Sequence, residues 1–183
     1  MKISIIIPSY NEIDNIEKLL NSIVQINNDF KVFIIDDSND NAIANIANKF
    51  HQVNYTYRGK KLGRGSAVID GMKKVLDEKL ADIIIEMDAD FSHDPQELIS
   101  NLNKFKKEKL DLLVSSRYKT DSQIINWSLR RRIFSKLSNK LARFLLKVPL
   151  SDYTNGYRIY SNRATKHVLS QCCLLYTSPS PRD

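Results

Sequence analysis

The sequence has little cysteine and no long apolar run. Its only two cysteines, Cys172 and Cys173, are neighbours near the end of the chain. They form no disulfide framework, so a cytoplasmic location is expected. No apolar stretch reaches the roughly 18 residues of a membrane-spanning helix. Pro8 interrupts the apolar run that follows Met1 and Lys2 before it is long enough for a signal peptide, so no secretory signal is predicted.

Glycine is also scarce, and the five glycines form neither a G-x-G-x-x-G fingerprint nor a P-loop. Gly63 and Gly65 do open a helical pattern in the stretch GKKLGRGSAVIDG, residues 59–71. There they would let a ligand approach the backbone, with Lys61 and Arg64 nearby to balance phosphate charge. A flexible loop before a helix explains the same residues equally well.

The net charge of +7 belongs to one segment. Residues 117–147 contain nine Lys or Arg and one acid, whereas the remainder contains 19 basic and 20 acidic residues. The basic residues of one helical stripe are Arg132, Lys136, Lys140, Arg143 and Lys147. The apolar residues beside them are Ile133, Phe134, Leu137, Leu141, Phe144 and Leu145. This pattern predicts a basic amphipathic helix near 127–147 that suits an anionic membrane surface. A solvated helix face is the alternative, and nucleic acid is disfavoured because no recognition motif accompanies the charge.

Short apolar runs alternate with helical patterns along most of the chain. The expected strands are Ile3–Pro8, Lys31–Asp36, Val53–Tyr57, Ile83–Asp88 and Leu112–Ser116. The expected helices are Asn15–Ile26, Ala42–Phe50, Gly65–Glu78 and Pro95–Lys107, the last with Asp94 as N-cap and Glu97 completing a capping box. The alternation predicts a single α/β domain with a mostly parallel sheet and helices on both faces.

Acidic residues collect where these strands end, which is where open α/β sheets bind ligands. Asp88 and Asp90 lie two positions apart after the fourth strand, so both carboxylates can face one point. They would repel each other unless a proton or a cation lay between them. Mg²⁺ and Mn²⁺ favour oxygen ligands, and Mg²⁺ commonly takes one or two carboxylates plus substrate phosphates. The pair therefore predicts a metal–diphosphate site, with a solvated turn as the alternative.

Other polar residues lie at the ends of the first two strands. Either Asp36 or Asp37 can bind a base or ribose, although a capping turn is again the alternative. Tyr10 and Glu12 can flank the same nucleotide.

Seven stretches form a recognisable pattern: SIIIPSYNE, IIDDS, KLGRGSAVIDGM, DADFSHDPQELI, SSRY, INWSLRRRIFS and SDYTNGYRIYS. Their order over residues 3–161 resembles that of the dolichol-phosphate mannosyltransferases, inverting glycosyltransferases with the GT-A fold. The resemblance implies a GT-A catalytic domain over residues 1–172, a sugar-nucleotide donor and a polyprenyl phosphate acceptor. GDP-mannose is the leading hypothesis for the donor, and UDP-glucose or another UDP-sugar is the main alternative.

The resemblance also implies roles for individual residues. Asp88 and Asp90 would hold Mg²⁺ or Mn²⁺ on the donor diphosphate. Arg117 and Arg131, with Ser135, would hold the acceptor phosphate. Of these, Asp90, Arg117 and Arg131 are the expected catalytic residues. The residues expected at the donor nucleotide are Pro8, Tyr10, Glu12, Asp36, Asp37, Arg64 and Asp88.

These roles describe a reaction without a catalytic base. A phosphate monoester has a second pKa of about 6, so the acceptor is largely anionic at neutral pH and its oxygen can attack the sugar directly. The metal and the basic residues would stabilise the departing diphosphate. A haloacid-dehalogenase-like phosphatase and a signalling receiver are remote alternatives, because their acidic motifs would follow the first strand.

The final segment, CLLYTSPSPRD (173–183), resembles a translated sequencing adaptor and is excluded from the fold prediction. A disordered tail is the alternative. If the adaptor interpretation holds, the natural chain continues beyond Cys172. With the basic helix, the sequence predicts a protein that is peripheral on the cytoplasmic face of a membrane.

Overall fold

The computed structural model describes residues 1–116, 129–148, 150, 152–153 and 155–172, without the side chains of 129–133, 136 and 146. The predictions for Arg117 and for residues 173–183 therefore lie outside the described residues.

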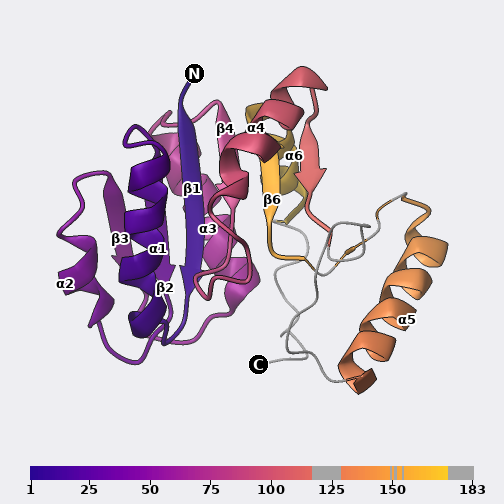
Figure 1. Ribbon diagram of the computed structural model, residues 1–183, viewed down its shortest axis with the longest axis horizontal. Helices are drawn as coiled ribbons and strands as arrows, with labels where there is room; N and C mark the ends of the chain where they lie inside the picture. Colours follow the sequence, from indigo (N-terminus) through magenta and orange to yellow (C-terminus); the bar gives the residue numbers. More distant parts are fainter. Residues whose placement is uncertain (117–128, 149, 151, 154, 173–183) are drawn as a thin grey trace.

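Six strands form one mixed sheet in the order β3-β2-β1-β4-β6-β5 (Figure 1). The strands are β1 (Ile3–Ser9), β2 (Lys31–Asp36), β3 (Val53–Tyr57), β4 (Ile83–Glu86), β5 (Leu112–Val114) and β6 (Arg158–Ser161). Strand β1 pairs in parallel with β2 and β4, and β2 with β3, whereas β6 runs antiparallel between β4 and β5. The predicted mostly parallel sheet is confirmed, and β6 is a strand that the sequence analysis missed.

Helices cover both faces of the sheet, as predicted. They are α1 (Ile13–Ile26), α2 (Ile43–Ala47), α3 (Arg64–Asp77), α4 (Glu97–Lys107), α5 (Leu129–Leu146) and α6 (Asn162–Cys172). The alternation of β1 shows why two layers are needed: Ile5 and Ile7 pack with α1, α2 and α4, while Ile6 packs with α3 and α6. All three side chains are fully buried, so neither face of the sheet can be left to solvent.

Two predicted boundaries differ from the structure near the acidic segment. Strand β4 ends at Glu86, two residues before the expected end at Asp88, because its partner β6 begins opposite it at Arg158. Helix α4 begins at Glu97 rather than at Pro95. The expected cap at Asp94 is therefore wrong: the N-cap is Gln96, without a side-chain hydrogen bond, and Oδ1 of Asp94 instead accepts the N–H of Gln96 at 2.9 Å in the turn that precedes the helix.

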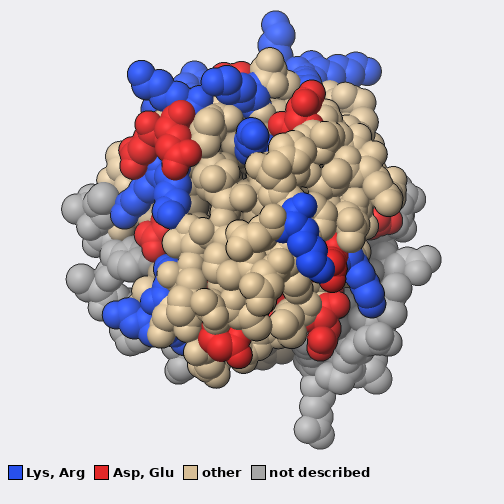
Figure 2. All heavy atoms as spheres, turned by 90° about the vertical axis from the view of Figure 1, so that its left-hand side faces the viewer, with Lys and Arg blue, Asp and Glu red and all other residues tan. Residues whose placement is uncertain are grey.

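Helix α5 lies to one side of the sheet (Figure 1), and its exposed residues include Phe134 and Phe144, with 73% and 78% of their surface accessible. No helix among the described residues combines the length and the apolar character needed to cross a bilayer. On the face over β3 and α2, positive and negative side chains are interspersed (Figure 2). This agrees with a chain whose excess positive charge lies in residues 117–147.

Candidate active site

The carboxyl ends of β1, β2 and β4 lie along one edge of the sheet, as predicted. Ser9 at the end of β1 pairs with Asp36 at the end of β2. Glu86 at the end of β4 pairs with Arg158, which begins the antiparallel β6. Asp88 follows β4 by two residues. The antiparallel strand therefore adds a basic residue to an otherwise acidic edge.

Arg64, the first residue of α3, holds the acidic residues at the end of β4. Its Nε donates to Oδ1 of Asp88 at 2.7 Å, and its Nη1 donates to Oε1 of Glu86 at 2.6 Å. Its Nη2 donates to the carbonyl oxygen of Gly156 at 2.9 Å. All three nitrogens of the guanidinium group are thus used, and they tie α3, β4 and the turn before β6 together.

Glu86 is the buried centre of this cluster. Its side chain is 2% exposed, and its second oxygen, Oε2, accepts the hydroxyl of Tyr160 at 2.9 Å. Nη1 of Arg158 lies 3.9 Å from the same oxygen. A buried carboxylate needs such partners, so we interpret Glu86 as the residue that fixes Arg64 in place.

Gly156 is required by the close packing of this cluster. A Cβ at this position would lie 2.2 Å from Oδ2 of Asp88 and 2.6 Å from Nη2 of Arg64. Any side chain would therefore displace the Asp88 carboxylate or the guanidinium group that holds it.

Asp88 is held in its ionised form. Burial alone would raise its pKa, but the contact with His93 and the positive charge of Arg64 lower the pKa of Asp88 to about 2. The Nε2 atom of His93 lies 3.8 Å from Oδ2 of Asp88. The side chain of Asp88 is 28% exposed, so this carboxylate is both charged and accessible.

The hydrogen-bond partners that the described residues offer Asp90 are local, unlike those of Asp88. Oδ1 of Asp90 accepts the N–H of Ser92 at 2.9 Å and also the hydroxyl of Ser92. The residue is exposed. Among the described residues, no group of three or more His, Cys, Asp or Glu converges on a possible metal position. Two carboxylates that leave the remaining positions to phosphates and water suit Mg²⁺ or Mn²⁺.

The acidic residues that follow β2 are engaged by the protein itself. Oδ1 of Asp36 accepts the N–H and the hydroxyl of Ser38 at 3.1 and 2.5 Å, and its Oδ2 accepts the hydroxyl of Tyr55 at 2.8 Å. Burial and Asp36 together raise the pKa of Tyr55. Nucleotide binding by Asp36 or Asp37 stays a prediction, and it would use carboxylates that the fold has already oriented.

Asp37 connects β2 to the loop that precedes α3. Its Oδ1 accepts Nε of Arg58 at 2.6 Å, and its Oδ2 accepts the N–H groups of Leu62 and Gly63, both at 2.9 Å. Nη1 of Arg58 also donates to Oδ2 of Asp70 on α3 at 2.9 Å. Because the loop ends directly before Arg64, this network determines where α3 begins.

The residues expected around the nucleotide surround the end of β1. Pro8 is buried within β1, and Tyr10 just beyond it is 39% exposed. Nζ of Lys61 lies 4.9 Å from the centroid of the Tyr10 ring, a cation–π distance. Oε2 of Glu12 accepts Nδ2 of Asn15 at 2.9 Å, at the start of α1.

Ser9 is a candidate site residue that the sequence analysis did not name. Its Oγ is buried, and no described residue forms a hydrogen bond with it. A buried hydroxyl without a partner costs about 1–3 kcal/mol. Ser9 lies at the end of β1, opposite Asp36 at the end of β2. It is therefore a further candidate contact for the sugar-nucleotide donor. A serine at this position has no pattern in the sequence that would have indicated this role.

The expected acceptor residues are not brought into this cluster by the described residues. Arg131 and Ser135 lie on α5, and the side chain of Arg131 is outside the described residues. Ser135 is half-buried, and its carbonyl oxygen accepts Nδ2 of Asn139 at 2.9 Å. Acceptor binding by these residues and by Arg117 therefore stays a prediction.

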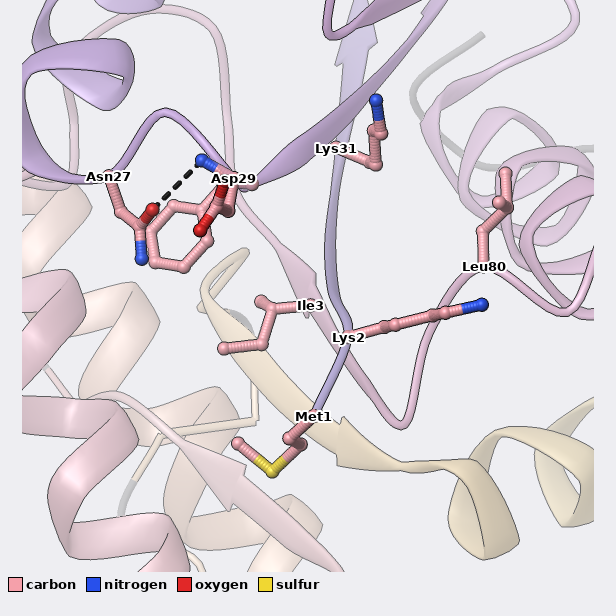
Figure 3. Close-up of a pocket in the computed structure, with 8 residues that line it drawn as sticks. Met1, Lys2, Ile3, Asn27, Asp29, Lys31 and Leu80 are labelled. Carbon is pink, nitrogen blue, oxygen red and sulfur yellow. Dashed lines mark hydrogen bonds between the residues drawn. The ribbon is translucent and has the colours of Figure 1, made fainter.

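One hollow lies at the opposite end of the sheet, next to the beginnings of β1 and β2 (Figure 3). Its lining residues are Met1, Lys2, Ile3, Asn27, Asp29, Phe30, Lys31 and Leu80. The N–H of Asp29 donates to Oδ1 of Asn27 at 2.8 Å across one rim. Because it lies at the amino ends of these strands, we do not assign this hollow to the acidic site.

A mixed α/β sheet with acidic residues along its carboxyl edge is the architecture of GT-A glycosyltransferases, and solved structures share it. Glucosyl-3-phosphoglycerate synthase from Mycobacterium tuberculosis, in complex with Mn²⁺, UDP and phosphoglyceric acid, matches 88% of this chain and 56% of its own at 18% identity, with a TM-score of 0.64. Mannosyltransferase PcManGT from Pyrobaculum calidifontis, in complex with GDP-Man and Mn²⁺, matches 91% of this chain and 46% of its own at 12% identity, with a TM-score of 0.60. These likenesses confirm the predicted fold.

A family model described as glycosyl transferase family 2 matches residues 4–169, so the chain belongs to this family. Over 169 residues it is 31% identical to polyprenol monophosphomannose synthase of Mycolicibacterium smegmatis, covering 90% of this chain and 63% of the relative. Over 164 residues it is 31% identical to undecaprenyl-phosphate mannosyltransferase of Micrococcus luteus, covering 87% of this chain and 66% of the relative. The chain thus spans slightly less than two thirds of the length of these relatives.

Proposed function

We propose that this chain is the catalytic part of an inverting glycosyltransferase that moves mannose from GDP-mannose to a polyprenyl phosphate. The observation that carries the proposal is the ionised, accessible Asp88 next to the exposed Asp90, at the sheet edge where a GT-A fold binds its donor. The names of the two relatives, which specify polyprenol or undecaprenyl phosphate and mannose, support this choice of substrates.

The donor is bound at the carboxyl edge of the sheet. Asp88 and Asp90 hold a Mg²⁺ or Mn²⁺ ion, which when bound neutralises the diphosphate leaving group. Tyr10, Glu12 and Asp36 border the nucleotide at the ends of β1 and β2. The network around Asp37 keeps the loop before α3 in a fixed position beside the phosphates.

The acceptor supplies its own nucleophile. Arg117 and Arg131, with Ser135, position the acceptor phosphate, which is largely anionic at neutral pH. One of its oxygens bonds to the anomeric carbon as the bond from this carbon to the diphosphate oxygen breaks, and the electron pair of that bond leaves with GDP. In-line attack inverts the anomeric centre, and no side chain has to remove a proton.

A donor panel tests the proposal. The purified chain is incubated with undecaprenyl phosphate, Mg²⁺ or Mn²⁺, and either GDP-mannose or UDP-glucose, and the lipid product is measured. We expect product from GDP-mannose, loss of product with a chelator, and recovery on adding either metal. Product from UDP-glucose alone would establish the alternative donor, and chelator-resistant transfer would remove the metal from the mechanism.

We further propose that α5 lies on the cytoplasmic surface of the membrane that holds the acceptor. Among the side chains of α5 that the structure describes, five large apolar ones are exposed: Phe134, Leu137, Leu141, Phe144 and Leu145. Basic residues alternate with them along the helix. An apolar face combined with positive charge fits the interface of an anionic bilayer rather than water.

Vesicle flotation tests this location. We expect the protein to float with vesicles that contain phosphatidylglycerol, and the double variant Phe134→Ser, Phe144→Ser to remain largely unbound. Ile99→Ser is the matched control, because Ile99 is an exposed apolar residue on α4 rather than on α5. Equal flotation of the double variant and the control would exclude α5 as the membrane contact.

A further inference from the structure

Arg64 already occupies a position that a metal-binding carboxylate would have to share. Its Nε is 2.7 Å from Oδ1 of Asp88, the residue proposed to hold the metal. Its other two nitrogens bond Glu86 and the carbonyl oxygen of Gly156. The guanidinium group therefore offsets part of the negative charge of this cluster without a metal.

The surrounding contacts limit how Asp88 can respond to a cation. On the side of Oδ2, the carboxylate meets His93 at 3.8 Å. On the side of Gly156, Oδ2 occupies the space that a Cβ would take, 2.2 Å from that position. Arg64 is the charged partner of Oδ1, so a cation that binds Oδ1 competes with the bond from Nε.

The side chain of Arg64 can move toward solvent. It is 40% exposed, in contrast to the buried side chain of Glu86. Glu86 would keep Tyr160 and Arg158 as partners if Arg64 moved. The cluster is therefore built so that one of its charged members can leave while the buried carboxylate stays paired.

We infer that Arg64 is an internal counter-cation that competes with the divalent metal for Asp88, so that metal binding requires the Arg64–Asp88 bond to break. This inference rests on the proposed metal site. It gives Arg64 a positioning role in the metal-free protein: the arginine keeps Asp88 ionised and aimed at the site. It also makes the free protein a weaker binder of metal than its carboxylates alone would be.

Mn²⁺ binding to the metal-free protein tests the competition without any measurement of sugar transfer. Free Mn²⁺ is followed by its electron paramagnetic resonance signal during a titration, first without nucleotide and then with GDP. A charge-assisted hydrogen bond that no longer competes corresponds to roughly a tenfold tighter Mn²⁺ affinity. We expect that gain in Arg64→Met, and a smaller gain in Arg64→Lys, which keeps the charge but cannot bond Asp88, Glu86 and Gly156 together.

The variant Arg64→Lys distinguishes competition for Asp88 from long-range repulsion between the positive side chain and the metal. If Arg64→Met binds Mn²⁺ more tightly but Arg64→Lys binds as the native protein does, the effect is long-range repulsion and the inference is wrong. Unchanged or weaker binding in both variants would also overturn it. Melting temperatures of the variants, measured without metal, show that each one is folded.

The same titration separates this inference from the proposed metal site. Asp88→Asn is expected to abolish Mn²⁺ binding whether or not Arg64 is present. If the native protein, Arg64→Met and Asp88→Asn bind Mn²⁺ equally, the metal site itself is wrong and the inference fails with it. If Asp88→Asn alone loses Mn²⁺ while the Arg64 variants match the native protein, the metal site stands and only the competition is refuted.

Discussion

The sheet edge and helix α5 carry the two halves of the proposed reaction, and they are built in opposite ways. At the edge, Asp36, Asp37, Glu86 and Asp88 each have hydrogen-bond or ionic partners from elements distant in sequence. On α5, large apolar side chains are exposed. The acidic residues of the edge thus have their partners within the chain, whereas the proposed membrane face of α5 would find its partner outside the chain. Substitutions at the edge should therefore change chemistry or folding, and substitutions on α5 should change location.

The largest expected effect is the loss of Asp90, the exposed member of the proposed metal pair. Asp90→Asn should lower sugar transfer by about 100- to 1000-fold, because it weakens the charge that holds the cation on the departing diphosphate. Folding should be unaffected, since the only described side-chain partner of Asp90 is the neighbouring Ser92. Initial rates at saturating GDP-mannose measure the loss of sugar transfer, and the melting temperature measures folding.

Ser92→Ala is the matched control for this variant. It removes the hydroxyl contact with Asp90 and leaves the carboxylate, so we expect a loss of about tenfold, the lower end of what the removal of such a supporting hydrogen bond costs. Comparable losses in the two variants would mean that the orientation of this turn matters rather than its charge.

Crowding the edge should have the next largest effect. Gly156→Ala places a methyl group 2.2 Å from Oδ2 of Asp88, so the carboxylate must shift. A displacement of about 1 Å at a reacting centre can reduce the rate by about 100-fold. The rate of transfer with GDP-mannose measures this effect.

Gly65 offers the matched control on the same edge. A Cβ at Gly65 meets nothing within 4 Å, and Gly65 lies in the first turn of α3. Gly65→Ala should keep full activity and gain up to about 1 kcal/mol of stability from helix propensity. An inactive Gly65→Ala protein would favour the close approach of a ligand to the backbone at Gly65 that the sequence predicts.

Much of the donor half could be predicted from the sequence because its signals are local. The runs at Lys31–Asp36 and Val53–Tyr57 are strands with the expected bounds, since apolar runs and turns specify both ends. Asp88 and Asp90 were predicted as site residues because they follow such a run directly, and their role stays a prediction. These residues need no information from elsewhere in the chain.

The elements that were missed depend on contacts between distant segments. The strand Arg158–Ser161 is short and polar at its ends, and it pairs with β4 on one side and with β5 on the other. Gly156 accepts a hydrogen bond from Arg64, 92 positions earlier. No periodicity within the stretch SDYTNGYRIYS could reveal either contact, although the motif itself was recognised.

A smaller effect, on stability, comes from the ion pairs of the edge. Arg58 and Asp37 have side chains only 7% and 5% exposed. Arg58→Met leaves Asp37 without its charged partner, which should lower the free energy of unfolding by about 3–5 kcal/mol. Leu137→Asn on α5 should change it by less than about 0.5 kcal/mol, because Leu137 is 63% exposed. Urea denaturation followed by circular dichroism measures both.

The exposed pair Lys49–Glu17 is the control for the loss of an ion pair as such. Its side chains are 58% and 44% exposed, and Lys49→Met should cost less than about 1 kcal/mol. If Arg58→Met lowered the free energy of unfolding by as little as Lys49→Met does, the buried ion pair of the edge would contribute no more to stability than an exposed pair.

The smallest expected effect concerns the charge of α5. Lys140 is exposed on this helix, and one lysine near an anionic bilayer contributes about 1 kcal/mol. Lys140→Gln should therefore weaken binding to phosphatidylglycerol vesicles by roughly fivefold and leave binding to neutral phosphatidylcholine vesicles unchanged. Lys73→Gln changes an exposed lysine on α3, on the far side of the sheet from α1, and should affect neither. If both substitutions weaken binding alike, net charge rather than α5 directs the protein to the membrane. The contrast between the sheet edge and α5 would then be smaller than their structures indicate.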